Sequence, residues 1–210
     1  MNRKRRKYGL MSRKGFSLIE VMITLTVLGI VAAVSAPAFM SLAPNMALKD
    51  AAAELYGTLQ QAKVLAIRNN RTITVRFDTP GFYYFDIDNN GAFSAGDARV
   101  VIGEDLNNND TLDAGEDFNG NGILDRNYGI RFGAGSAADD WLAAGNGCVQ
   151  VQSIQFNSRG LATITSAAPP PLPSVASVYI QNQNNISYAV ETRVAGSITT
   201  RKFNGTVWSN

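Results

Sequence analysis

The sequence predicts an α+β protein in which one long N-terminal helix packs on a β-rich globular domain. Two successive patterns of apolar residues along the chain support this prediction. Up to residue 70, apolar residues either form a nearly unbroken run or recur every three to four positions, which is typical of helices. From Arg71 onwards they alternate with polar residues in short runs, which is typical of strands. The roughly 140 residues 71–210 suffice for one hydrophobic core.

Residues 16–40 are almost entirely apolar and, as a helix, long enough to cross a bilayer core of about 30 Å. The preceding residues 1–15 form a basic leader without an acidic side chain, and its cations are Arg3, Lys4, Arg5, Arg6, Lys7, Arg13 and Lys14. Because cationic flanks stay in the cytoplasm, we expect a single-pass protein whose C-terminal domain lies outside it. A secretory signal peptide has the same polarity. Cleavage after Ala38, at the end of a weak signal-peptidase site, is therefore the alternative.

A single carboxylate, Glu20, lies inside the apolar run. An acidic residue in a membrane helix costs about 2.5–3.5 kcal/mol at the helix centre and less near an end, and it usually marks a function. The alternative is local, because Ser17 and Glu20 have the spacing of a capping box that would satisfy amides at the helix start. A capping box does not explain why the basic leader stops at Gly15.

The segment Lys14–Val21 (KGFSLIEV) resembles the type III signal sequence of type IV prepilins and type II secretion pseudopilins. The resemblance implies that a prepilin peptidase cuts after Gly15 and methylates the new N-terminal Phe16. It also implies that Glu20 compensates the N-terminal amine of a neighbouring subunit in a filament. A low-dielectric core favours such a pair over an unpaired buried charge.

The composition excludes several kinds of function. Removal of the leader would take away seven of the 19 Lys and Arg residues, leaving 12 cations against 17 acidic side chains and a formal charge of −5. The pI of about 8.7 therefore gives no support for nucleic-acid binding. The chain has no histidine, which excludes a hydrolytic triad with histidine and removes the commonest zinc ligand. Cys148 is the only cysteine, so it is either a small buried residue or one half of an intermolecular bridge.

Residues 41–70 are predicted to form an amphipathic helix that continues the membrane helix. Its apolar positions recur at steps of four and three and share one face: Leu48, Ala52, Leu55, Leu59, Ala62 and Ala66. Asn69 and Asn70 can end the helix in a left-handed conformation. We expect bends near Pro37 and Pro44, because proline removes a backbone hydrogen bond.

Residues 71–210 are predicted to form the globular domain, whose apolar runs alternate or are rich in β-branched and aromatic residues. The expected strands are 72–77, 82–85, 99–102, 148–157, 161–165, 175–182, 186–193 and 197–203.

The order of several segments is similar to that of the GspH and FimT group of minor pseudopilins and minor pilins. These segments are Leu59–Asn70 followed by a strand, Gly81-Phe82 leading to Asp86–Gly91, Ile154–Gly160, and a C-terminal strand after Gly196 with Trp208. The resemblance implies a pilin-like fold and a subunit that acts in filament assembly and protein contact, not an enzyme. It also implies an inner-membrane location, with the C-terminal domain in the periplasm or on the cell surface. Other pilin or pseudopilin subunits and the prepilin peptidase are the implied partners, without a small-molecule substrate.

Some FimT-type proteins bind DNA through a basic Gly-Arg-x-Arg segment. The corresponding segment here, Gly196–Lys202, has serine and threonine in place of the two arginines. Arg193, Arg201 and Lys202 remain as a modest basic group, whereas phosphate contacts require clustered cations. DNA uptake linked to a pilus is therefore an alternative, and nucleic acid is not the expected partner.

The insertion 86–125 contains oxygen-bearing side chains with the spacing of calcium-binding loops. The first register consists of Asp86, Asp88, Asn90, Ser94 and Asp97, with glycine at the sixth position. The second consists of Asp105, Asn107, Asn109, Asp113 and Glu116, with an aspartate at that position. The third, Asp117, Asn119, Asn121 and Asp125, lacks a closing carboxylate.

Asp-Asn-Gly sequences also form turns for conformational reasons alone, and for one loop this explanation would suffice. Three successive registers favour calcium, because their carboxylates would repel one another without a cation. The expected role is structural, in rigidifying an insertion with too little apolar content to fold by itself. A secreted calcium-binding adhesion domain is the alternative outside the pilin class.

The leader and helix do not distinguish a type II secretion system from a type IV pilus.

Overall fold

A computed structural model describes residues 15–77, 81–106, 111–118, 120–124, 128–139, 147–166 and 175–209. The chain divides into two compact units, Met1–Ser41 and Leu42–Asn210. The helix α1 runs from Leu18 to Arg68, through both units. The apolar and amphipathic segments are thus parts of one continuous helix, while the bends at Pro37 and Pro44 stay a prediction.

The end of α1 follows from the two asparagines after it. Asn70 adopts a left-handed conformation with φ of 47°. The amide of Asn69 donates to Leu65 O over 2.9 Å, and that of Arg71 donates to Ala66 O over 3.1 Å. These bonds satisfy carbonyls of the last helical turn, which confirms the predicted helix stop.

The globular unit contains two antiparallel sheets of five strands each. The first has the order β3-β2-β1-β5-β6, with strands β1 (Ile73–Arg76), β2 (Phe82–Asp86), β3 (Ala98–Val101), β5 (Val151–Phe156) and β6 (Ala162–Ser166). The second has the order β10-β9-β8-β7-β4, with strands β4 (Arg131–Phe132), β7 (Val175–Gln181), β8 (Ser187–Arg193), β9 (Ile198–Phe203) and β10 (Trp208–Ser209). All eight predicted strands are confirmed. The α+β fold class, with a helix on a β-rich domain, is confirmed as well.

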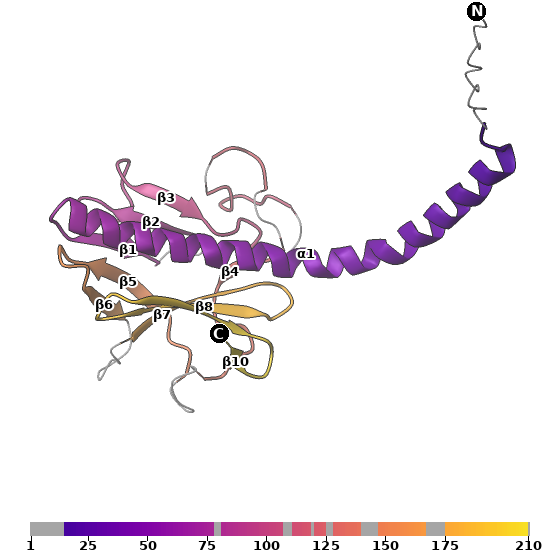
Figure 1. Ribbon diagram of the computed structural model, residues 1–210. Helices are drawn as coiled ribbons and strands as arrows, with labels where there is room; N and C mark the ends of the chain where they lie inside the picture. The colour runs from indigo at the N-terminus through magenta and orange to yellow at the C-terminus, as the bar shows by residue number, and fades with distance from the viewer. Residues whose placement is uncertain are drawn as a thin grey trace, which may run out of the picture. The chain divides into compact units, whose positions relative to one another are not determined.

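The C-terminal half of α1 packs on both sheets and completes the main core. In Figure 1 it runs along the globular unit, with β2 and β3 on one side and β7 and β8 on the other. The predicted apolar face is fully buried, at Leu48, Ala52, Leu55, Leu59, Ala62 and Ala66. These residues belong to one cluster with Val75, Tyr83 and Ile154 of the first sheet and Val178 and Val190 of the second. Burial of this face against both sheets stabilises the helix far more than helix propensity does.

A close joint forms where the last turns of α1 meet two hairpin turns. Lys63 Nζ donates to Gly196 O over 2.8 Å. A Cβ added to Gly196 would collide with Gly160 O, and one added to Gly160 would lie 2.9 Å from Ile67 Cδ1. Both glycines have positive φ, 75° at Gly160 and 78° at Gly196. Glycine is therefore required here both for conformation and for space.

Candidate functional site

The described part of the N-terminal unit is an apolar helix, in which three hydroxyl side chains are hydrogen-bonded to the helix backbone. Leu18–Ser35 is long and apolar enough to cross a membrane, with a mean hydropathy of 2.3, and none of it is buried inside the protein. The hydroxyls of Thr24, Thr26 and Ser35 each donate over 2.8 Å to a backbone carbonyl three or four residues earlier. A polar side chain paired in this way is tolerated in hydrocarbon. The segment therefore suits a single membrane anchor.

The predicted processing and docking residues lie at the accessible start of this helix. Phe16 is 82% exposed, and a Cβ at Gly15 would meet open space. Glu20 lies in the first turn and is exposed. The backbone carbonyl of Ser17 accepts from the amides of Glu20 and Val21 over 3.0 and 3.2 Å. In the described part of the helix, these are backbone contacts and the side-chain pair of a capping box is not formed, which leaves the Glu20 carboxylate accessible.

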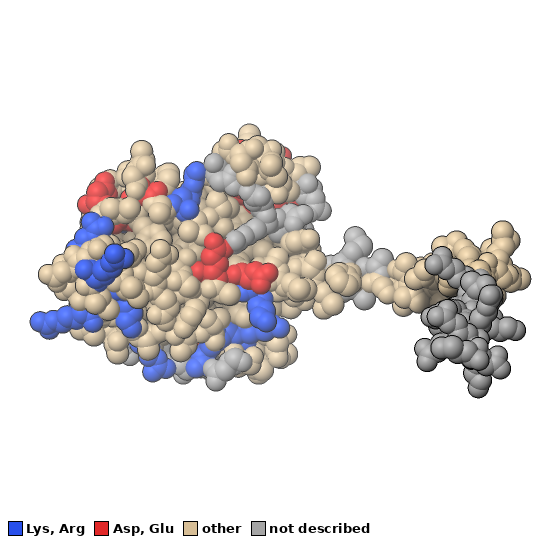
Figure 2. All heavy atoms as spheres, turned by 45° about the horizontal axis from the view of Figure 1, so that its top comes forward, with Lys and Arg blue, Asp and Glu red and all other residues tan. Residues whose placement is uncertain are grey.

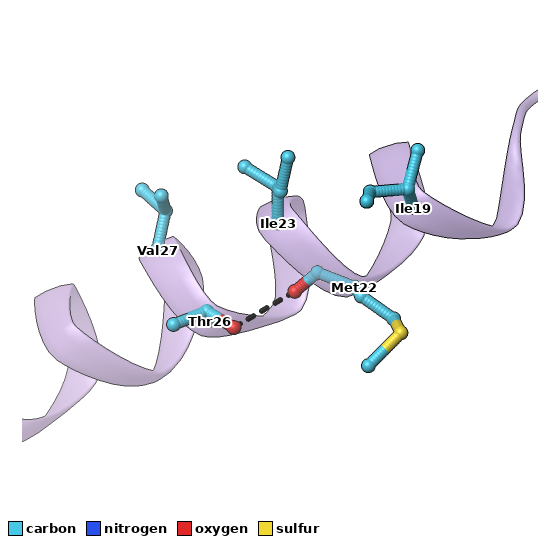
Figure 3. Close-up of a pocket in the computed structure, with 5 residues that line it drawn as sticks. All are labelled: Ile19, Met22, Ile23, Thr26 and Val27. Atoms are coloured by element: carbon cyan, nitrogen blue, oxygen red, sulfur yellow. Dashed lines mark hydrogen bonds between the residues drawn. The ribbon is translucent and has the colours of Figure 1, made fainter.

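One side of the helix start forms a shallow open hollow. It is lined by Ile19, Met22, Ile23, Thr26 and Val27. Figure 3 shows Ile19, Ile23 and Val27 projecting to the same side, while the Thr26 hydroxyl donates to the carbonyl of Met22. Residues three and four apart share a helix face, so this surface is a continuous apolar strip next to Glu20. Such a strip has the geometry that packs against another apolar helix.

The first acidic loop, between β2 and β3, brings three carboxylates of the first register together. One oxygen from each of Asp86, Asp88 and Asp97 lies within 4.8 Å of the other two. The amides of Asn90 and Gly91 each donate to the Asp86 carboxylate over 3.1 Å. These bonds hold the carboxylate in place at the loop start. The cluster offers three oxygens of the kind that calcium prefers.

The same loop is stabilised in its ionised state by groups of the protein. Arg76 Nε lies 2.8 Å from Asp86 Oδ2, and Asp86 is buried. Asp97 accepts from the amides of Ile87 and Ser94 over 2.9 and 2.7 Å and from the Ser94 hydroxyl over 2.9 Å. Burial raises the pKa of Asp97, but these hydrogen bonds outweigh it and hold the pKa below its ordinary value. A cation would therefore compete with Arg76, which the motif gave no reason to include.

The second register is divided between buried and exposed positions. Asp105 and Glu116 are buried, whereas Asp113 is exposed. The Glu116 carboxylate accepts from the amides of Leu106 and Asp113 over 3.2 and 3.3 Å. Glu116 thus closes this loop through backbone amides. Among the described residues, the group of three convergent carboxylates lies in the first loop instead.

The third register is a turn around Asp117. Its carboxylate accepts from the amides of Gly120, Asn121 and Gly122 over 2.6, 3.1 and 2.9 Å. Asn121 in turn accepts from the amide of Ile123 over 2.6 Å. This is the bonding of successive Asx turns, which needs no ion. Four predicted ligands of the second and third registers lie outside the described residues: Asn107, Asn109, Asn119 and Asp125.

The basic residues near the C-terminus are partly engaged inside the domain. Arg201 Nε lies 3.0 Å from Glu191 Oε1, in an ion pair without the directed geometry of a hydrogen bond. Arg193 is exposed and Lys202 half-buried. On the face drawn in Figure 2, Lys and Arg side chains are spread over several places, and Asp and Glu form separate groups. Since Arg201 neutralises a buried carboxylate, it is poorly suited to contact phosphate.

The apolar N-terminal helix and the antiparallel domain define a pilin-like α+β protein with a single membrane anchor. Residues 10–36 match the family model of the prokaryotic N-terminal methylation motif, and residues 51–196 match that of the type II transport protein GspH. The chain belongs to the GspH family, which confirms the predicted resemblance. No curated protein and no solved structure matches the chain significantly.

Proposed function

We propose that the chain is a minor pseudopilin or minor pilin that prepilin peptidase cuts between Gly15 and Phe16 and that enters a filament through its N-terminal helix. The globular domain lies on the periplasmic side or at the cell surface and contacts neighbouring subunits. The role is assembly and protein contact, without catalysis. The observation that carries the proposal is the methylation motif directly before an exposed apolar helix, on a chain that continues into a GspH domain.

Glu20 is the group that recruits the helix into the filament in this proposal. Its carboxylate is accessible and lies next to the apolar strip lined by Ile19, Met22 and Ile23. A neighbouring subunit that packs on the strip brings its N-terminal amine into a low-dielectric environment, where an opposite charge is required. The exposed Phe16 supplies that amine after processing.

Docking and capping make different predictions for two variants of the full chain in its native membranes. If Glu20 docks an amine, Glu20→Ala is processed normally but is absent from sheared filaments, whereas Ser17→Ala is incorporated like the wild type. If the pair only caps the helix, both variants lose incorporation to a similar degree. Normal incorporation of Glu20→Ala would refute the docking role.

The processing step is tested by the mass of the mature N-terminus. The expected product starts at a methylated Phe16 and disappears when prepilin peptidase is removed. A start directly after Ala38 would instead support a secreted protein released by signal peptidase. That result would favour a secreted calcium-binding adhesion domain over a filament subunit.

We also propose that the first acidic loop binds calcium through Asp86, Asp88 and Asp97, with Asn90 and Ser94 beside them. The convergence of three carboxylates supports this site, while the ion pair of Asp86 with Arg76 predicts weak binding. Calorimetry with calcium should give a signal for the wild type that Asp88→Asn abolishes. A matched control, Asp117→Asn, should bind like the wild type, and equal binding by Asp88→Asn would contradict the site.

A further inference from the structure

The outer face of the first sheet carries an aromatic cluster that is separate from the main core. Strand β2 is buried at every position, although alternate residues of a strand point to opposite faces. Tyr83 and Phe85 belong to the main core. Phe82 and Tyr84 therefore point to the other face, yet they are only 9% and 1% exposed. Something must cover them.

The covering rings come from the acidic insertion. Phe93, in the first acidic loop, lies 5.5 Å from Phe82 and 5.3 Å from Tyr84, measured between ring centroids and at steep interplanar angles of 70° and 75°. Phe118, which follows the second register, lies 5.4 Å from Phe82. These separations are those of favourable aromatic pairs. Two acidic loops thus pack on one ring, that of Phe82.

Arg99 on β3 closes the cluster from the side. Its guanidinium carbon lies 5.4 Å from the centroid of Phe82 and 5.2 Å from that of Phe93. Both distances allow a cation–π contact. Arg99 is exposed as a residue, so the cluster is covered without a buried unpaired charge.

Phe118 is fixed in position by its backbone as well as by its ring. Its amide donates to Oε1 of the fully buried Glu104 over 3.1 Å. A Cβ added to Gly81 would collide with the Phe118 ring, so the ring lies directly against the main chain at the start of β2. The hydrogen bond between Phe118 and Glu104 therefore joins the end of the second loop to its beginning.

We propose that Phe82, Tyr84, Phe93, Phe118 and Arg99, here called the aromatic cluster, make the first acidic loop, 87–97, and the described parts of the second, 104–106 and 111–118, a single cooperative unit. Phe93 and Phe118 both limit the movement of the Phe82 ring, so loss of either leaves a gap beside the ring on which the other packs. The insertion therefore packs two phenylalanines on strand β2, an apolar contact that its composition did not predict. A cation or partner that orders the first loop thereby also orders residues 104–106 and 111–118.

Hydrogen exchange of the full chain in detergent micelles tests this coupling, with no ion required. Phe93→Ala should accelerate amide exchange about tenfold not only in 87–97 but also in 111–118. Phe118→Ala should do the same in the reverse direction. The double variant should be less destabilised than the sum of the two single variants, since each substitution removes support from the same ring.

Two controls separate coupling from local damage. Ile87→Ala removes an exposed apolar side chain from the first loop outside the aromatic cluster and should affect that loop alone. Ile123→Ala removes an exposed apolar side chain beyond Phe118 and should leave exchange in the first loop unchanged. If Phe93→Ala and Phe118→Ala each accelerate exchange only in their own loop, or if their effects add, the proposal is overturned. Should an alanine variant not fold, Phe93→Leu and Phe118→Leu replace it, and an exchange effect confined to the substituted loop again refutes the coupling.

Discussion

The joint between the last turns of α1 and the two hairpin turns gives a sharp test of what holds the domain together. In Gly196→Ala, the new Cβ would collide with Gly160 O and would stand at a φ of 78°. The left-handed conformation costs a non-glycine residue roughly 1–2 kcal/mol. Separation of the two turns would also lengthen the bond from Lys63 Nζ to Gly196 O, a charged hydrogen bond worth about 1.5–3 kcal/mol. We expect a total loss of about 2.5–5 kcal/mol.

Gly205→Ala is the matched control. Gly205 also has positive φ, 98°, in a turn next to β9, but a Cβ there would meet open space. This variant should lose only the conformational term of roughly 1–2 kcal/mol. Urea denaturation of the full chain in detergent, followed by near-ultraviolet circular dichroism, measures both free energies of unfolding. Equal losses for the two variants would refute the argument that close packing at the joint is what requires Gly196.

Three further predictions concern other parts of the domain. Arg201→Met should lower the free energy of unfolding by about 3–5 kcal/mol, because it leaves the charge of Glu191, whose side chain is 0% exposed, without its ion-pair partner. Glu191→Gln should cost less, because the Arg201 side chain is 20% exposed and can reach water. A denaturation experiment in which Glu191→Gln costs more would contradict this reasoning. Tyr83→Phe should cost about 1–3 kcal/mol by removing the 3.0 Å bond to Thr58, and adding Thr58→Val should recover much of it, whereas additive losses would exclude the bond as the cause. Asp97 has a lowered pKa, so the stability it contributes is present above the ordinary aspartate pKa of about 3.9 and is lost as the pH falls through the lower folded value. Asp97→Asn should remove this part of the acid dependence, and an unchanged stability profile between about pH 5 and 2 would speak against it.

Long elements were predictable because their patterns are local. The period of apolar residues is visible over several neighbouring residues in the eight longer strands and on the face of α1 from Leu48 to Ala66. These elements can therefore be recognised from the sequence. Strands β4 and β10 have two residues each, which is too short for any alternation. They exist because β7 and β9 offer edges for pairing, at Arg131 with Gln181 and at Trp208 with Phe203.

The candidate site was predictable where its residues are close together in the sequence. The motif from Gly15 to Glu20 is a short contiguous signal, and its family is confirmed by the match to residues 10–36. The acidic registers were also visible, but spacing alone did not distinguish the convergent first loop from the turn around Asp117. Arg76 was missed because it comes from β1, ten residues before its partner Asp86.

The sequence by itself determined the family, the membrane helix, the strand periods and the positions of the acidic loops, because each of these depends on neighbours along the chain. The tertiary structure alone decided which carboxylates meet, that Arg76 and Arg201 neutralise buried acids, and that Phe93 and Phe118 share the ring of Phe82. Ion pairs and ring contacts require side chains from different strands and loops within a few ångströms. Strand pairing and burial set those distances, and neither is written in any one segment of the chain.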